Sequence, residues 1–430
     1  MSLPRLQINK ILSNETLRNG VFFTVFSFIN KGINFILLIL LARYITPAEY
    51  GYWSLFGTIV MFMGYFIAMT TEGYLSISFF KEGMGGVQKT FSCVFSTSLI
   101  VAFIFSVFTW LFQPILSNRL DVPWRYLYLA IGISFFTIYS NICLDFLRVK
   151  KKILFYGIFS CCSAILILGL SIFFVKFMLI GWFGCILAQL LCVCLFGFIG
   201  FIFFLQMGCL AFPEKKHWKM ILLWGIPLIP HLATGFIRFG CDRYIVNHFY
   251  SVEDVGYFSF AVALTTAIVM IGSGFNDANS VNIFEILGNN DYSSERKIAI
   301  LNKQKKMIFL VYLVCSILVS TLCYFLVPLF LPQYTQAMKY FIILAFYGFF
   351  QCVYFLYTNF LFFFKGTKQL MTITFSCALL HLVLSLLLTR FSIYYTCVVS
   401  CFTQICIVFF VRKNAIKTLE DNLNCKVRIF

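Results

Sequence analysis

Long apolar runs, separated by short polar connections, cover most of the sequence. Twelve of these runs have about 20 residues or more, the length that an α-helix needs to cross about 30 Å of hydrocarbon. They lack the strict two-residue alternation of transmembrane β-strands. The pattern predicts an all-α polytopic membrane protein with about twelve transmembrane helices. We expect these helices near residues 21–41, 50–71, 91–113, 124–146, 153–175, 179–206, 221–249, 255–276, 307–331, 338–364, 370–389 and 391–411.

The composition excludes an ordinary soluble protein. Of 430 residues, 61% are hydrophobic and 11% are charged, whereas soluble domains have roughly 45–50% apolar and about 25% charged residues. The net charge of +17 does not indicate a nucleic-acid partner, because basic residues gather where apolar runs end and not on one face. We interpret the 17 cysteines as small packing residues, and predict no disulfide framework, metal site or cofactor.

Lys and Arg are distributed unequally between the two sets of connections. If both termini lie on one side, most of the 33 Lys and Arg residues fall on that side. Because cytoplasmic connections carry this excess, we predict that both termini are cytoplasmic. The longest polar connection, residues 277–306, would then be cytoplasmic, with a short surface helix near 281–287. The opposite side receives Arg43, Arg119, Arg125, Lys176, Lys339 and Arg390.

Four charged residues lie inside the predicted spans and away from the span ends: Lys31, Arg238, Asp242 and Arg243. Such residues cost about 2.5–3.5 kcal/mol at the centre of a membrane helix and are functional candidates for that reason. Arg238 and Asp242 are four residues apart and can pair on one helical face, which leaves Arg243 unmatched. We expect Lys31, Arg238 and Arg243 to form a cationic substrate-binding lumen supported by Asp242. The alternative is a set of structural contacts, including a salt bridge between lobes.

Helix breakers and helix-end charges suggest moving parts. Pro227 and Pro230 remove backbone hydrogen bonds from the seventh span, and we interpret them as a hinge; a static kink is the alternative. Charges at the predicted cytoplasmic ends of spans are solvated residues by default, and a cytoplasmic gate is the alternative. These candidate gate residues are Glu72, Asp145, Arg148 and Asp277. We interpret His381 as a packing residue and not as a proton carrier.

The connection after the first span resembles the connection after the seventh. Aligning Gly51 with Gly256 also aligns Tyr52 with Tyr257 and residues 47–49 with residues 252–254. Because the two connections are six spans apart, the halves have the same orientation in the membrane, as in a parallel repeat. We therefore predict two six-helix lobes, residues 1–206 and 221–411, joined by a cytoplasmic linker at 207–220 and followed by a basic tail at 412–430.

These connections carry a family resemblance. The segment A-R-Y-I-T-P-A-E-Y-G at residues 42–51, the pair Asp242-Arg243 and the segment V-G-Y-F-S-F-A at residues 255–261 resemble bacterial polysaccharide flippases. These are the Wzx-type transporters of O-antigen and capsule repeat units, within the multidrug/oligosaccharidyl-lipid/polysaccharide exporter superfamily. The resemblance covers the whole chain in span number and spacing, while its specific part is limited to these turns.

The resemblance implies a function and a location. It implies a flippase of the bacterial inner membrane that carries an undecaprenyl-diphosphate-linked oligosaccharide to the outer leaflet by alternating access. A polysaccharide polymerase and a chain-length regulator are the protein partners it suggests. The alternatives are a multidrug or cation antiporter, which would need a deep unpaired carboxylate, and a membrane-embedded polymerase or glycosyltransferase, which would need convergent acids on an external loop. The sequence has no G-x4-G-K-[ST] loop, so we do not expect ATP hydrolysis.

Overall fold

The computed structural model describes residues 15–289 and 291–423, and this part of the chain is helical almost throughout, without a β-strand. Twelve helices in these described residues are long and apolar enough to cross a membrane, which confirms the predicted fold class. The helical segments are α2 (Glu15–Tyr44), α3 (Pro47–Ile67), η1 (Thr71–Gly73), α4 (Tyr74–Leu111), α5 (Gln113–Leu120), α6 (Trp124–Val149), α7 (Ile153–Ile172), η2 (Phe173–Phe177), α8 (Trp182–Gln206), α9 (Lys215–Gly225), η3 (Ile226–Leu228), α10 (Ile229–Gly235), η4 (Phe236–Gly240), α11 (Cys241–Phe249), α12 (Val252–Gly288), α13 (Ser294–Phe330), η5 (Pro332–Tyr334), α14 (Ala337–Phe363), α15 (Thr367–Leu388) and α16 (Ile393–Leu423).

The chain divides into two compact units. Unit 1 comprises residues up to Ile45 and Tyr52–Ala233, and unit 2 comprises Thr46–Gly51 and Thr234 onward. Residues 207–220, which we expected to form a linker, belong to unit 1, and α9 begins within them. The last helix, α16, continues through Leu423 into the predicted basic tail. The first 14 residues of the predicted lobe and residues 424–430 of the tail lie outside the described residues.

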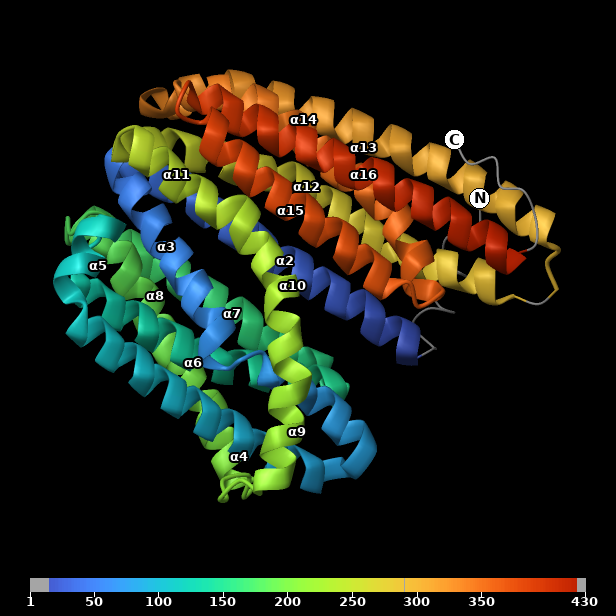
Figure 1. Cartoon of the computed structure of the whole chain (residues 1–430), viewed down its shortest axis with the longest axis horizontal. Helices are drawn as coiled ribbons and strands as arrows, with labels where there is room; N and C mark the ends of the chain where they lie inside the picture. Colours follow the sequence, from blue (N-terminus) through green and yellow to red (C-terminus); the bar gives the residue numbers. More distant parts are fainter. Residues whose placement is uncertain (1–14, 290, 424–430) are drawn as a thin grey trace. The chain divides into compact units, whose positions relative to one another are not determined.

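Unit 1 is a bundle in which α6 packs against α8 and α4, and α7 packs against α2 (Figure 1). Aromatic side chains fill its centre: Phe91 and Phe204 are fully buried, and their rings stack at 4.7 Å. The one polar atom of Tyr139 is satisfied, since its hydroxyl lies 2.8 Å from Ser98 Oγ. Rings of this size bury a large apolar area, which fixes the relative positions of the spans they join.

Unit 2 is built around α14, which packs against both α12 and α16 (Figure 1). The helices α12 and α13 have 37 residues each, about 55 Å of helix, which exceeds the hydrocarbon thickness. Residues 281–287 continue α12 to Gly288, so the separate surface helix that we predicted there is wrong. The physical reason is a buried cluster in which Ile283 and Leu287 pack with Leu301 and Leu419.

The two similar connections have the same local structure. Thr46 Oγ1 and N donate to Glu49 Oε2, and Glu49 N donates back to Thr46 Oγ1. Ser251 and Asp254 form the same three hydrogen bonds, so each helix begins with a capping box. The aligned residues therefore cap the N-terminus of a helix in both halves of the sequence.

The aligned glycines also make reciprocal contacts inside unit 2. A Cβ added to Gly51 would lie 2.1 Å from the carbonyl oxygen of Val252, and one added to Gly256 would lie 1.8 Å from that of Pro47. Both distances are far below van der Waals contact, so only glycine permits this approach. Exchange of equivalent partners is the pattern that a local twofold relationship between the two connections produces.

The seventh span departs from α-helical geometry at two places. The 3-10 segment η3 contains Pro227, and the π-helical segment η4 contains Arg238. A proline removes a backbone donor, and a π turn inserts an extra residue, so the side chains beyond each break point in new directions. Pro227 and Pro230 therefore lie where the helix changes its geometry, and their role as a hinge stays a prediction.

Candidate functional site

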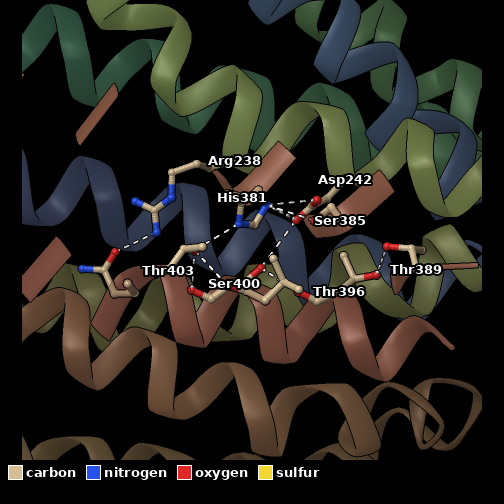
Figure 2. Close-up of polar contacts among 10 residues, drawn as sticks. Arg238, Asp242, His381, Ser385, Thr389, Thr396, Ser400 and Thr403 are labelled. Atoms are coloured by element: carbon tan, nitrogen blue, oxygen red, sulfur yellow. Dashed lines mark hydrogen bonds and ion pairs between the residues drawn. The ribbon is translucent and has the colours of Figure 1, made fainter. Parts of the chain in front are cut away.

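The most buried charged group among the sequence-predicted residues is Asp242 of α11, in unit 2. Its side chain is 1% exposed, and both carboxylate oxygens lie 3.0–3.1 Å from His381 Nε2 on α15. Figure 2 shows His381 between Asp242 and Thr403. The second ring nitrogen also has a partner, because His381 Nδ1 lies 3.1 Å from Thr403 Oγ1 on α16. Three helices are thus joined by one polar cluster.

Two tautomers of His381 satisfy the hydrogen bonds of this cluster. Thr403 Oγ1 can accept from His381 Nδ1–H while it donates to the carbonyl oxygen of Val399 at 2.8 Å, or it can donate to His381 Nδ1. Nε2 faces two carboxylate oxygens, so a hydrogen on Nε2 or on the carboxyl group lies between His381 and Asp242. In either arrangement the buried carboxyl group of Asp242 is hydrogen-bonded, as a buried polar group has to be.

Further hydroxyl groups surround the pair. Ser400 Oγ lies 3.5 Å from Asp242 Oδ2, and Ser385 Oγ lies 3.4 Å from His381 Nε2. At the next turn of the same two helices, Thr389 Oγ1 and Thr396 Oγ1 are 2.8 Å apart. The sequence carried a signal for this cluster that our prediction missed. Hydroxyl residues and His381 recur at helical spacing in two predominantly apolar spans, at His381, Ser385 and Thr389 and at Thr396, Ser400 and Thr403.

Arg238 differs from our expectation in its partner. Its Nη2 donates to Gln404 Oε1 at 2.7 Å, and its guanidinium lies 5.5 Å from the ring centre of Tyr347. Within the described part of the chain, Arg238 forms no ion pair with Asp242 or any other acid. The π turn at residues 236–240 explains this, because it ends the α-helical spacing that would place residues four apart on one face. The positive charge of Arg238 is therefore uncompensated by a carboxylate.

The other predicted cations have different settings. Arg243 of α11 is half-buried, and its Nε donates to Ser259 Oγ on α12 at 3.3 Å. Lys31 is exposed on α2 in unit 1. The neighbouring Asn30 donates to the carbonyl oxygen of Ser160 at 2.8 Å, which turns that residue toward α7. Lys31 follows about 100° further round the helix and so points away from Asn30. The cationic lumen as a whole stays a prediction.

Three of the four predicted gate residues line one cavity in unit 1. Asp145 and Arg148 form an ion pair at 2.7 Å on the last turns of α6, and Glu72 lies on η1. The fourth, Asp277, is exposed on α12 of unit 2. The cavity has a volume of about 400 Å³. Its walls are Thr70, Glu72, Gly73, Asn141, Leu144, Asp145, Arg148, Tyr156, Trp224, Leu228 and Leu232.

One atom in this cavity is distinctive. Glu72 Oε2 is buried, yet it has no hydrogen-bond partner anywhere in residues 15–289 and 291–423. The turn that carries Glu72 is held in place, because Thr70 Oγ1 donates to the carbonyl oxygen of Gly225 at 2.6 Å. Both Met69 and Thr70 have positive φ angles, of 47° and 56°, which non-glycine residues adopt rarely. The gate remains a prediction, but these side chains do form one polar cavity.

Twelve helices of the described residues are long and apolar enough to span a membrane, and they define a multi-pass membrane protein. Solved structures share this fold. The chain resembles an inward-facing multidrug resistance MATE family transporter of the MOP superfamily, with 12% identity, a TM-score of 0.72, and coverage of 93% of this chain and 96% of that chain. It also resembles the lipid II flippase MurJ in an inward closed conformation, with 15% identity, a TM-score of 0.71, and coverage of 94% and 90%.

Sequence comparison identifies the family. Residues 16–278 match the polysaccharide biosynthesis protein family, and the chain belongs to that family. Residues 227–387 match the MatE family as well. A relative from Haemophilus influenzae, Lsg locus putative protein 1, is 21% identical over 281 residues, covering 64% of this chain and 67% of the relative. The chain is therefore a multi-pass membrane protein of the polysaccharide biosynthesis protein family.

Proposed function

We propose that this protein is a flippase for an oligosaccharide repeat unit linked to undecaprenyl diphosphate, used in O-antigen or capsule synthesis. The observation that carries the proposal is the family match over residues 16–278, which links the chain to polysaccharide synthesis. Its fold also resembles that of a lipid II flippase. A lipid of this kind has an anionic headgroup that must cross the hydrocarbon layer, so the protein has to offer it positive charge.

Arg238 is the best candidate to supply that charge. It lies within a spanning segment, keeps a neutral amide partner and has no acid paired with it in the described part of the chain. A planar guanidinium presents several donors at once and therefore suits phosphate oxygens. We propose that Arg238 contacts the diphosphate, and that Lys31 and Arg243 contact it as well during translocation.

The proposed flippase has a defined topology and a defined direction of transport. We propose that both termini lie in the cytoplasm and that the lipid moves from the cytoplasmic to the outer leaflet of the bacterial inner membrane. The unequal distribution of Lys and Arg supports this topology. A polysaccharide polymerase and a chain-length regulator would act on the delivered repeat unit and are the partners we propose. Fusions of the C-terminus to a fluorescent protein and to alkaline phosphatase test the topology, because only the former should be active.

A cation antiporter is the second candidate, supported by the MatE match over residues 227–387 and by the buried Asp242. Such a transporter exchanges its cargo for a cation that binds a carboxylate. The carboxylate of Asp242 already faces His381 through both of its oxygens. This arrangement favours the flippase, because an antiporter needs the acid to be available to a solute ion.

A transport assay separates the two candidates. Purified protein would be reconstituted into vesicles with a fluorescent undecaprenyl-diphosphate disaccharide, and transbilayer movement would be measured by quenching of the outer leaflet. We expect movement above that of empty vesicles, strong loss in Arg238→Glu, and little change in the control Arg390→Gln, which alters an arginine at the end of a span. Ethidium efflux driven by a pH gradient, without lipid movement, would overturn the flippase proposal in favour of the antiporter.

A further inference from the structure

The cavity of unit 1 contains a buried acceptor that no side chain satisfies. Glu72 Oε2 has no hydrogen-bond partner in the described part of the chain, although nearly all buried polar atoms in proteins have one. The other acid of the cavity, Asp145, is already paired with Arg148 at 2.7 Å. Glu72 therefore supplies an unsatisfied acceptor to the lining. A ligand that donates hydrogen bonds would satisfy this atom, whereas a carboxylate ligand has no hydrogen to donate to it.

Aromatic and amide groups complete the cavity. Trp224 and Tyr156 contribute rings, and Asn141 contributes an exposed amide. The indole of Trp224 is held edge to face against Tyr74 at 5.4 Å, and a Cβ on Gly73 would come within 3.1 Å of it. The absence of a side chain at Gly73 thus lets the indole lie beside the turn that carries Glu72. Acceptors and donors next to flat apolar rings match a pyranose, which has hydroxyl groups at its edge and C–H groups on its faces.

The size and position of the cavity fit the same ligand. Its volume of about 400 Å³ is within the range of about 300–1,000 Å³ that small-molecule sites occupy. It lies where α6 ends and α7 begins, beside Lys150, Lys151 and Lys152, which places it at the predicted cytoplasmic side.

We propose that this cavity binds one or two neutral sugar residues of the lipid-linked oligosaccharide before translocation. Glu72 accepts hydrogen bonds from sugar hydroxyls, and Trp224 packs against a ring face. The site selects neutral sugars over uronic acids, because a uronic carboxylate replaces a hydroxyl donor by a group that only accepts hydrogen bonds. This inference rests on the proposed flippase function and adds a specificity that the diphosphate cannot supply, since the diphosphate is common to all such lipids.

Binding of free sugars tests the site without requiring transport. The full-length protein in lipid nanodiscs would be mixed with N,N'-diacetylchitobiose or with a disaccharide that contains glucuronic acid, and binding would be followed by saturation-transfer NMR. We expect the neutral disaccharide to bind more tightly than the acidic one. Glu72→Ala should weaken that binding about tenfold, because it removes a buried acceptor, and Glu72→Gln, which keeps a carbonyl acceptor, should weaken it less.

The matched control is Glu82→Gln. Glu82 lies on α4 of the same unit and does not line the cavity. Its carboxylate is exposed to solvent and lies 3.8 Å from the amino group of Lys89. This variant should bind the neutral disaccharide as the unmodified protein does. Equal weakening by Glu72→Ala and Glu82→Gln, preference for the acidic disaccharide, or Glu72-dependent binding of tetraphenylphosphonium in place of sugar would each overturn the inference.

The same variants in the vesicle assay separate this inference from the proposed function. If the unmodified protein moves the lipid and Glu72→Ala moves neutral and acidic headgroups at unchanged relative rates, the sugar site is wrong while the flippase remains. If the unmodified protein moves no lipid but still binds the neutral disaccharide through Glu72, the flippase is wrong while the sugar site remains. We expect a loss of at least threefold for the neutral headgroup in Glu72→Ala.

Discussion

The carboxyl groups in the polar cluster of unit 2 and in the cavity of unit 1 differ in their hydrogen-bond partners. Asp242 faces His381 through both of its oxygens and is 1% exposed. Glu72 is half-buried, and its Oε2 has no partner in residues 15–289 and 291–423. A satisfied network holds helices together, whereas an unsatisfied atom in a cavity keeps binding capacity for a ligand. Buried charge in this protein therefore serves structure in one unit, and we infer recognition in the other.

The largest effect should come from breaking the satisfied pair. Asp242→Ala leaves His381 without its partner and should cost about 3–5 kcal/mol of stability, since removal of one member of a buried pair leaves the other uncompensated. Asp242→Asn should cost less, because its amide can donate to a neutral Nε2. Unfolding in detergent, followed by a thiol-reactive dye on the buried cysteines, measures both. The double variant Asp242→Ala/His381→Ala should lose less than the two single losses added together; simple additivity would show that the pair is not coupled.

A smaller loss is expected at the wall of the cavity. A Cβ on Gly225 would lie 2.4 Å from the carbonyl oxygen of Met69, so Gly225→Ala must displace the turn that carries Thr70 and Glu72. We expect about 1–3 kcal/mol of destabilisation, as for other overpacked sites. Gly57→Ala in α3 is the control, because a Cβ there meets nothing within 4 Å. Equal unfolding temperatures for the two variants would show that the turn carrying Thr70 and Glu72 is not held rigidly against Gly225.

The unsatisfied acid should respond in the opposite sense to Asp242. Glu72→Gln removes a carboxylate that has no partner for Oε2, so stability should stay the same or rise by up to about 1 kcal/mol. The same detergent unfolding experiment measures this change. A loss comparable to that of Asp242→Asn would mean that Glu72 is held by the fold and that the contrast between the units is false.

The smallest effect should come from the exposed pair of Glu82 and Lys89, which are 3.8 Å apart with about half of each side chain accessible. Surface ion pairs contribute about 0–1 kcal/mol, so Lys89→Ala should leave the unfolding temperature nearly unchanged. This variant sets the baseline for the other three. A clear fall in the unfolding temperature would indicate that charged residues outside the cavity lining also contribute to the stability of this unit.

Features that depend on local periodicity could be predicted from the amino-acid sequence. Twelve apolar runs predicted the twelve spans, and alignment of Gly51 with Gly256 identified two connections that share the same capping box. Span length and helix capping involve residues within a few positions of one another, so they can be predicted without knowing the packing.

The contacts between polar groups became clear only from the packing of the helices. Asp242 and His381 are 139 residues apart in the chain, and the π turn at residues 236–240 separated Arg238 from the acid that its spacing had suggested. The cavity around Glu72 likewise forms from the ends of several helices. Such contacts depend on how helices are rotated and packed against one another, and a change of one residue per turn is enough to exchange the partner of a buried charge.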